Sequence, residues 1–131
     1  MKVLALDYGA ARTGVAVSDP TGTLARPLEV VGRAASPPGL ARLAELVRLE
    51  EAERVVVGLP LTLRGEHGAQ AEETARFVEA LRGVVDVPVE TFDERFTTAL
   101  AGQDSGVAEE DARAAAHLLA SYLEWTSSRP A

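Results

Sequence analysis

Apolar residues in the first third of the chain recur at the spacing of strands. They form stretches at residues 2–7, 13–18 and 27–31, and the second stretch alternates Val15 and Val17 with small residues. The links between these stretches, "YGAAR" and "DPTGTLAR", are short and rich in turn-forming residues. Apolar alternation interrupted by short turns predicts three strands in an antiparallel meander.

From residue 36 onward, helical stretches alternate with apolar runs. The helical stretches cover residues 36–53, 68–83 and 108–125, and the apolar runs cover residues 54–60 and 87–93. The second helical stretch carries Ala71, Ala75, Val78 and Leu81 on one predicted face. Strands that alternate with helices form crossover units. The chain therefore predicts an α/β fold with one five-stranded mixed sheet, an antiparallel meander followed by α-β-α-β-α, and helices on the faces of the sheet.

The composition supports one domain with one core. The chain has 131 residues, of which 47% are hydrophobic, and we expect the domain to cover residues 1–126 with 127–131 as a flexible tail. It has no cysteine, which excludes disulfides and thiolate metal sites. No apolar stretch approaches the roughly 20 residues that span a bilayer, and the N-terminus lacks a signal-peptide pattern. We therefore expect a cytoplasmic protein with no membrane partner.

The first candidate for chemistry is a carboxylate at the end of the first predicted strand. Asp7 is followed by Gly9, Arg12 and Gly14, in the pattern D-x-G-x-x-R-x-G. An aspartate that caps a hairpin, with glycines for the turn, would explain part of this pattern. A turn needs no arginine, however, and a loop that faces a phosphate can use Arg12.

A second acidic candidate follows the last predicted strand, in "FDERFTTALA". Asp93, Glu94 and Arg95 are consecutive, so their side chains cannot all point one way. A solvated loop, with Thr97 or Thr98 capping a helix, is the plain alternative. We favour Glu94 as the acid that turns towards Asp7, and Arg95 as a residue that reaches phosphate or fixes a neighbouring side chain.

The third acidic candidate lies in the last predicted helix. Asp111 falls on the apolar stripe that Ala115, Leu118, Tyr122 and Trp125 form at helical spacing. An acid that points inward is costly unless something pairs with it. Favourable placement near the start of the helix is the alternative, but the inward direction of the stripe leaves Asp111 unexplained.

Three acids from distant parts of the chain could meet at one edge of the sheet. Asp7, Glu94 and Asp111 would repel one another unless a cation neutralised them. Hard oxygen ligands, without cysteine or a histidine cluster, suit Mg²⁺ or Mn²⁺. Two such ions about 4 Å apart can activate water and stabilise the leaving oxygen in phosphodiester cleavage. We therefore predict that these acids are metal ligands and catalytic residues.

Four blocks of the chain resemble the YqgF family, also called RuvX. The blocks are "LALDYGAARTGVAVSD", "VVVGLPLTLRGEHG", "VETFDERFTT" and "EDARAAAHLLASYLE", and they extend over about residues 1–124. The resemblance implies a ribonuclease H-like fold and a nuclease that matures the 5′ end of pre-16S rRNA, or else a Holliday junction resolvase-like DNA endonuclease or exonuclease. It implies acidic site residues at Asp7, Glu94 and Asp111, and substrate-binding residues at Arg12, Arg95, Thr97 and Thr98.

Charge sets the expected strength of nucleic-acid binding. The net charge is −7 at pH 7, residues 96–110 are acidic where the family is often basic, and position 11 is alanine. Because phosphate neutralisation supplies much of the affinity for nucleic acid, we expect transient contact with pre-rRNA or branched DNA. The protein should be a monomer or a weak homodimer, and the sequence does not separate RNA from DNA as the substrate.

Two other classes of protein stay open at this point. An ATP-binding protein of the actin and sugar-kinase type would share the D-x-G hairpin, but it needs two such domains around a cleft. A non-catalytic module that takes part in ribosome assembly or transcription would suit the acidic surface.

Overall fold

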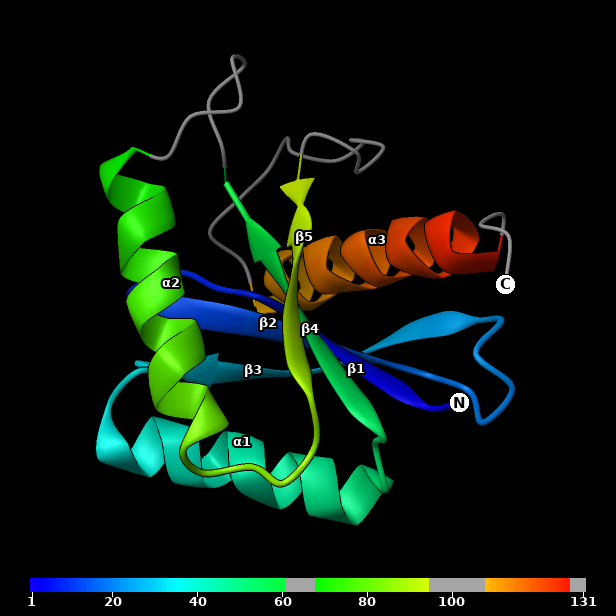
Figure 1. The fold of residues 1–131 in the computed structure, drawn as a ribbon, viewed down its shortest axis with the longest axis horizontal. Helices are drawn as coiled ribbons and strands as arrows, with labels where there is room; N and C mark the ends of the chain where they lie inside the picture. Colours follow the sequence, from blue (N-terminus) through cyan, green and yellow to red (C-terminus); the bar gives the residue numbers. More distant parts are fainter. Residues whose placement is uncertain (61–67, 95–107, 128–131) are drawn as a thin grey trace.

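The computed structural model describes residues 1–60, 68–94 and 108–127 of the chain, without the side chains of residues 108 and 109. In that part, strands and helices follow the predicted order (Figure 1). They are β1 (Val3–Asp7), β2 (Arg12–Ser18), β3 (Ala25–Gly32), α1 (Pro37–Glu50), β4 (Arg54–Leu59), α2 (Ala69–Arg82), β5 (Val89–Asp93) and α3 (Ala108–Ser127). The third strand begins two residues earlier than predicted, and α3 continues to Ser127.

The strands form one sheet in the order β3-β2-β1-β4-β5. Antiparallel pairing joins β1 to β2 and β2 to β3, and parallel pairing joins β1 to β4 and β4 to β5. The prediction of a five-stranded mixed sheet that starts with an antiparallel meander is confirmed. Because β1, β4 and β5 are parallel, their carboxyl ends meet at one edge, where ligands of such sheets commonly bind.

Each face of the sheet packs against its own helices. Leu4 and Leu6 of β1 belong to the core that α1 and α2 cover, whereas Val3 and Ala5 belong to the core that α3 covers. Figure 1 shows the sheet between these two helical layers. Successive side chains of a strand point to opposite faces. Asp7 therefore follows Val3 and Ala5 onto the face that α3 covers.

The buried faces of the helices differ in part from those predicted. In α2, Ala71, Val78 and Leu81 are buried as expected, but Ala75 is only half-buried and Phe77 is buried instead. The rings of Phe77 and Tyr8 stack with their centroids 4.3 Å apart. This face of α2 therefore packs against Tyr8, the residue that follows Asp7. None of the described helices is long and apolar enough to cross a membrane.

Candidate active site

Asp7 stands between two glycines in a row that runs across the sheet. It pairs with Gly14 of β2 on one side. On the other side, Leu6 pairs with Val57 of β4, so the next residue, Gly58, lies beside Asp7. Neither neighbour has a side chain, so the space above both is open to groups from other elements. The carboxylate thus occupies the centre of a gap on the face of the sheet that α3 covers.

Asp111 takes the space above Gly14. A Cβ atom added to Gly14 would lie 1.9 Å from the backbone oxygen of Asp111 and 3.0 Å from the nitrogen of Ala112. Helix α3 therefore packs directly on β2 at this point, and it brings Asp111 close to the space around Asp7. Gly14 therefore does more than shape a turn, because the backbone of α3 occupies the space above it.

Glu94 takes the space above Gly58. A Cβ atom on Gly58 would lie 2.8 Å from Oε2 of Glu94 and 2.9 Å from its Cγ. Phe92 packs in the core under α3, so alternation along β5 directs Asp93 to the opposite face. The structure thus turns Glu94, rather than Asp93, towards Asp7.

The electrostatics of the site show that these carboxylates act on one another. Burial, followed by the charge of Asp111, raises the pKa of Asp7 from 3.8 to about 6. Burial, followed by the charges of Asp7 and Asp93, raises the pKa of Glu94 from 4.5 to about 7. Asp7 is the centre of the group, because its charge is coupled to both of the other acids. Near neutral pH, the group is stable only with bound protons or a compensating cation.

Arg12 supplies a positive charge on one side of the group. Its Nε atom lies 2.8 Å from Oδ2 of Asp111, and the two side chains are 42% and 25% exposed. The Oδ2 atom is nevertheless buried and accepts no hydrogen bond from the residues that the structure describes. The contact is therefore an attraction between charges without the direction of a hydrogen bond. Arg12, which the sequence interpretation assigned to phosphate, faces the acids in this structure.

The donor set suits a hard divalent cation. Within residues 1–60, 68–94 and 108–127, no three acidic or histidine side chains are arranged to bind one ion together. The chemistry still fits, because the group offers only carboxylate oxygens, one of them buried without a hydrogen bond, and two of its acids have raised pKa values. Asp7, Glu94 and Asp111 are the residues that would hold such an ion.

Some predicted site residues lie outside the described part of the chain. In addition, the sequence interpretation gave too small a role to two described glycines, Gly14 and Gly58. Arg95, Thr97 and Thr98 fall outside the described residues, so their assignment to substrate stays a prediction. Gly58 was not singled out. A glycine inside the apolar run "RVVVGLP" could have signalled it, because glycine in a buried strand often marks close approach of another group.

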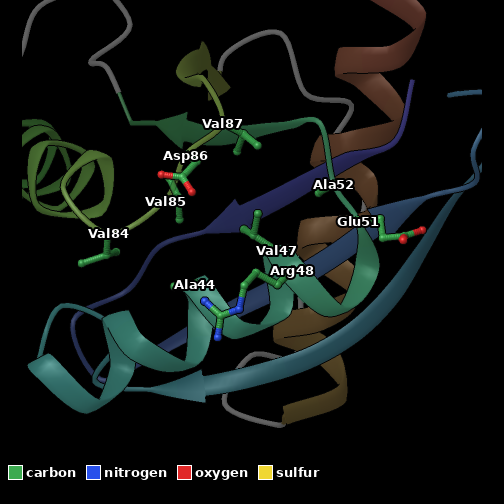
Figure 2. A pocket seen from close by; sticks show the side chains of 9 residues that line it. All are labelled: Ala44, Val47, Arg48, Glu51, Ala52, Val84, Val85, Asp86 and Val87. Carbon is green, nitrogen blue, oxygen red and sulfur yellow. The ribbon is translucent and has the colours of Figure 1, made fainter.

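A separate pocket of about 260 Å³ lies at the opposite edge of the sheet (Figure 2). The end of α1 and the segment between α2 and β5 form its walls, with Val47, Arg48 and Asp86 among the lining residues. Ala52, also in its lining, precedes the start of β4, whereas the acidic group lies where β4 ends. The pocket is therefore not part of the acidic site.

The sheet order, the packing of α3 on the acidic face and the acids at its edge define an α/β protein of the ribonuclease H-like class. Two solved structures of RuvC from Thermus thermophilus share this fold. The RuvC complex with a Holliday junction substrate has a TM-score of 0.62 and 20% identity, and covers 98% of this chain and 96% of its own. A second RuvC structure has a TM-score of 0.58 and 21% identity, with 100% of both chains covered.

The sequence narrows the class to one family. A family model described as "RuvX: Holliday junction resolvase" matches residues 1–125, and the chain belongs to the RuvX family, as the four blocks indicated. A protein of Rubrobacter xylanophilus is 49% identical over 131 residues (94% of this chain, 92% of its own). One from Chloroflexus aggregans is 50% identical over 103 residues (77% and 71%). Both carry the name "Putative pre-16S rRNA nuclease".

Proposed function

We propose that this protein is a divalent-metal-dependent nuclease that hydrolyses phosphodiester bonds in structured nucleic acid, with the 5′ end of pre-16S rRNA as its substrate. One observation carries the proposal. The fold brings Asp111 and Glu94 over the two glycines that flank Asp7, so acids from three distant segments share one site. A cluster of coupled carboxylates has no stabilising role of its own, and it suits a cation that acts on phosphate.

The roles of the side chains follow from their places around the site. Asp7, Glu94 and Asp111 would hold Mg²⁺ or Mn²⁺, and we propose that two such ions take part. When bound, such ions lower the pKa of water and neutralise charge at the phosphate. Arg12 lies at the rim and would steady a phosphate oxygen of the substrate. Arg95, Thr97 and Thr98 remain the further substrate-binding residues that we propose.

The choice of substrate rests on the relatives. Proteins that are 42% to 50% identical over most of their length are named for pre-16S rRNA. The description of the family, by contrast, names Holliday junctions, so branched DNA is the second candidate. With a net charge of −7, the protein should bind either substrate weakly and briefly. We place this activity in the cytoplasm, in a monomer or a weak homodimer.

A cleavage panel tests the proposal. The purified protein is incubated with a pre-16S rRNA leader, a four-way DNA junction and linear duplex DNA, each with Mn²⁺, with Mg²⁺ or with EDTA. We expect cleavage of the rRNA leader that requires the metal ion. Cleavage of the junction alone would favour the second candidate. Absence of both cleavage and Mn²⁺ binding in a folded protein would favour a non-catalytic module instead, and saturable ATP binding without cleavage would favour the kinase-like class.

Matched variants connect the activity to the acidic site. Asp7→Asn, Glu94→Gln and Asp111→Asn should each lower the cleavage rate by at least about 100-fold, because even residues that only support metal ligands contribute about 10- to 100-fold. Glu110→Gln is the control, since Glu110 precedes Asp111 in α3 but pairs with Arg113. It should cleave at the wild-type rate. Equal cleavage by wild type and Asp7→Asn would remove that acid from the mechanism.

A further inference from the structure

The contact between Arg12 and Asp111 combines a short distance between opposite charges with the lack of a hydrogen bond to Oδ2 from the described residues. The charges are close, with 2.8 Å between Nε and Oδ2. Yet within the described part of the chain Oδ2 accepts no hydrogen bond although it is buried, so Arg12 supplies charge without a hydrogen bond to that oxygen. A buried carboxylate oxygen is normally hydrogen-bonded or bound to a metal ion. The ion pair with Arg12 therefore leaves the hydrogen-bonding capacity of Oδ2 unused.

We propose that Arg12 is a positioning residue that takes the place of a divalent cation on Asp111 in the metal-free protein, so that metal and guanidinium exchange at Oδ2. The inference rests on the proposed function, because it concerns the same acids. It accounts for the fact that no three of the described acidic side chains are arranged around a common point. Asp111 is turned to Arg12 until a cation competes for it.

The fold determines which partner moves in this exchange. The backbone of Asp111 packs directly on Gly14, where even one added carbon atom would collide with it, so a shift of Asp111 would need this close contact between α3 and β2 to open. Arg12 is the first residue of β2, and its side chain is 42% exposed. Arg12 is therefore the partner that we expect to move, because a long side chain at the rim can carry its charged end into solvent. Once displaced, the guanidinium lies at the same edge and is available to a substrate phosphate.

Titration calorimetry on the metal-free protein, without nucleic acid, tests the exchange. MnCl₂ is added to wild type, Arg12→Ala and Arg113→Ala. We expect Arg12→Ala to bind Mn²⁺ about three- to fivefold more tightly than wild type, which is the scale of a partly exposed ion pair. Arg113 is the matched control, because it also pairs with an acid of α3, at 3.7 Å from Glu110, but does not contact Asp111. Its removal tests the general effect of losing one positive charge.

Thermal unfolding gives a second readout. With EDTA, Arg12→Ala should unfold at a lower temperature than wild type, and Mn²⁺ should raise its unfolding temperature more than it raises that of wild type.

A Mn²⁺ affinity of Arg12→Ala equal to or weaker than that of wild type would overturn the exchange and leave the nuclease proposal standing. An equal gain in Arg113→Ala would overturn it too, since charge alone would then suffice. If wild type and Arg12→Ala both fail to bind Mn²⁺, the metal site and the exchange fall together.

Discussion

Replacing Asp7 by asparagine should stabilise the metal-free protein. The side chain sits between Gly14 and Gly58, under α3, where water reaches it poorly, and it meets the charge of Asp111. Asparagine has nearly the same shape and no charge. The substitution therefore removes the cost of a buried negative charge and leaves the packing of the row unchanged.

The size of the effect follows from the raised pKa of Asp7. The pKa is about 6 in the folded protein and 3.8 without the fold, so the folded state binds the proton more tightly. The free energy of unfolding therefore decreases as the pH rises from about 4 to 6, and the full cost is present above that range. A pKa difference of about 2 corresponds to about 3 kcal/mol. Because part of the site is open to solvent, we expect a net gain of about 1–2 kcal/mol at pH 8.

Urea unfolding in EDTA measures this gain. Wild type and Asp7→Asn are compared at pH 8 and pH 5, with Glu110→Gln as the control that removes an acid outside the group. At pH 8, Asp7→Asn should have the higher free energy of unfolding. The same gain should raise its unfolding temperature by about 3–6 °C. At pH 5 the difference should fall to about half, because Asp7 is then largely protonated in the folded state. A difference that does not depend on pH, or a less stable variant at pH 8, would refute the electrostatic reasoning.

Three further outcomes follow from the row of residues around Asp7. Gly14→Ala should lower the free energy of unfolding by about 3 kcal/mol or more in urea, because its Cβ would collide with the backbone of Asp111. Gly58→Ala should change stability by less than about 1 kcal/mol, since its Cβ meets only the movable side chain of Glu94. Its Mn²⁺ affinity by calorimetry should nevertheless fall about tenfold. In wild type, Mn²⁺ affinity should weaken as the pH drops from 8 to 5.5, because Glu94, with its pKa of about 7, and Asp7 must lose their protons to bind.

The order of the strands and helices could be predicted because each rests on a local pattern. Apolar alternation identified the meander, and the change to helical spacing after residue 36 identified the crossovers. The inward direction of Asp111 was visible in the same way, from the stripe that Ala115 and Leu118 continue, both of which are buried. Patterns of this kind need no knowledge of which segments meet in space.

The composition of the site could be predicted less well, because it depends on register between distant strands. Nothing local to Gly58 states that it lies beside Asp7, or that Glu94 will fold back over it. Register also decided between Asp93 and Glu94, which the sequence alone left as a preference. The contact of Arg12 with Asp111 joins residues 99 positions apart, and only the packing of α3 on β2 brings them together.

The site is made as much by missing side chains as by acids. If Gly14 and Gly58 carried side chains, Asp7 would stand alone in its row, because α3 could not pack on Gly14 and the side chain of Glu94 would be displaced from Gly58. An isolated Asp7 would also destabilise the fold less, because burial and like charge together raise the pKa of this acid and of Glu94. A fold under selection for stability alone would separate these carboxylates. Their convergence therefore supports our proposal that these carboxylates bind a cation.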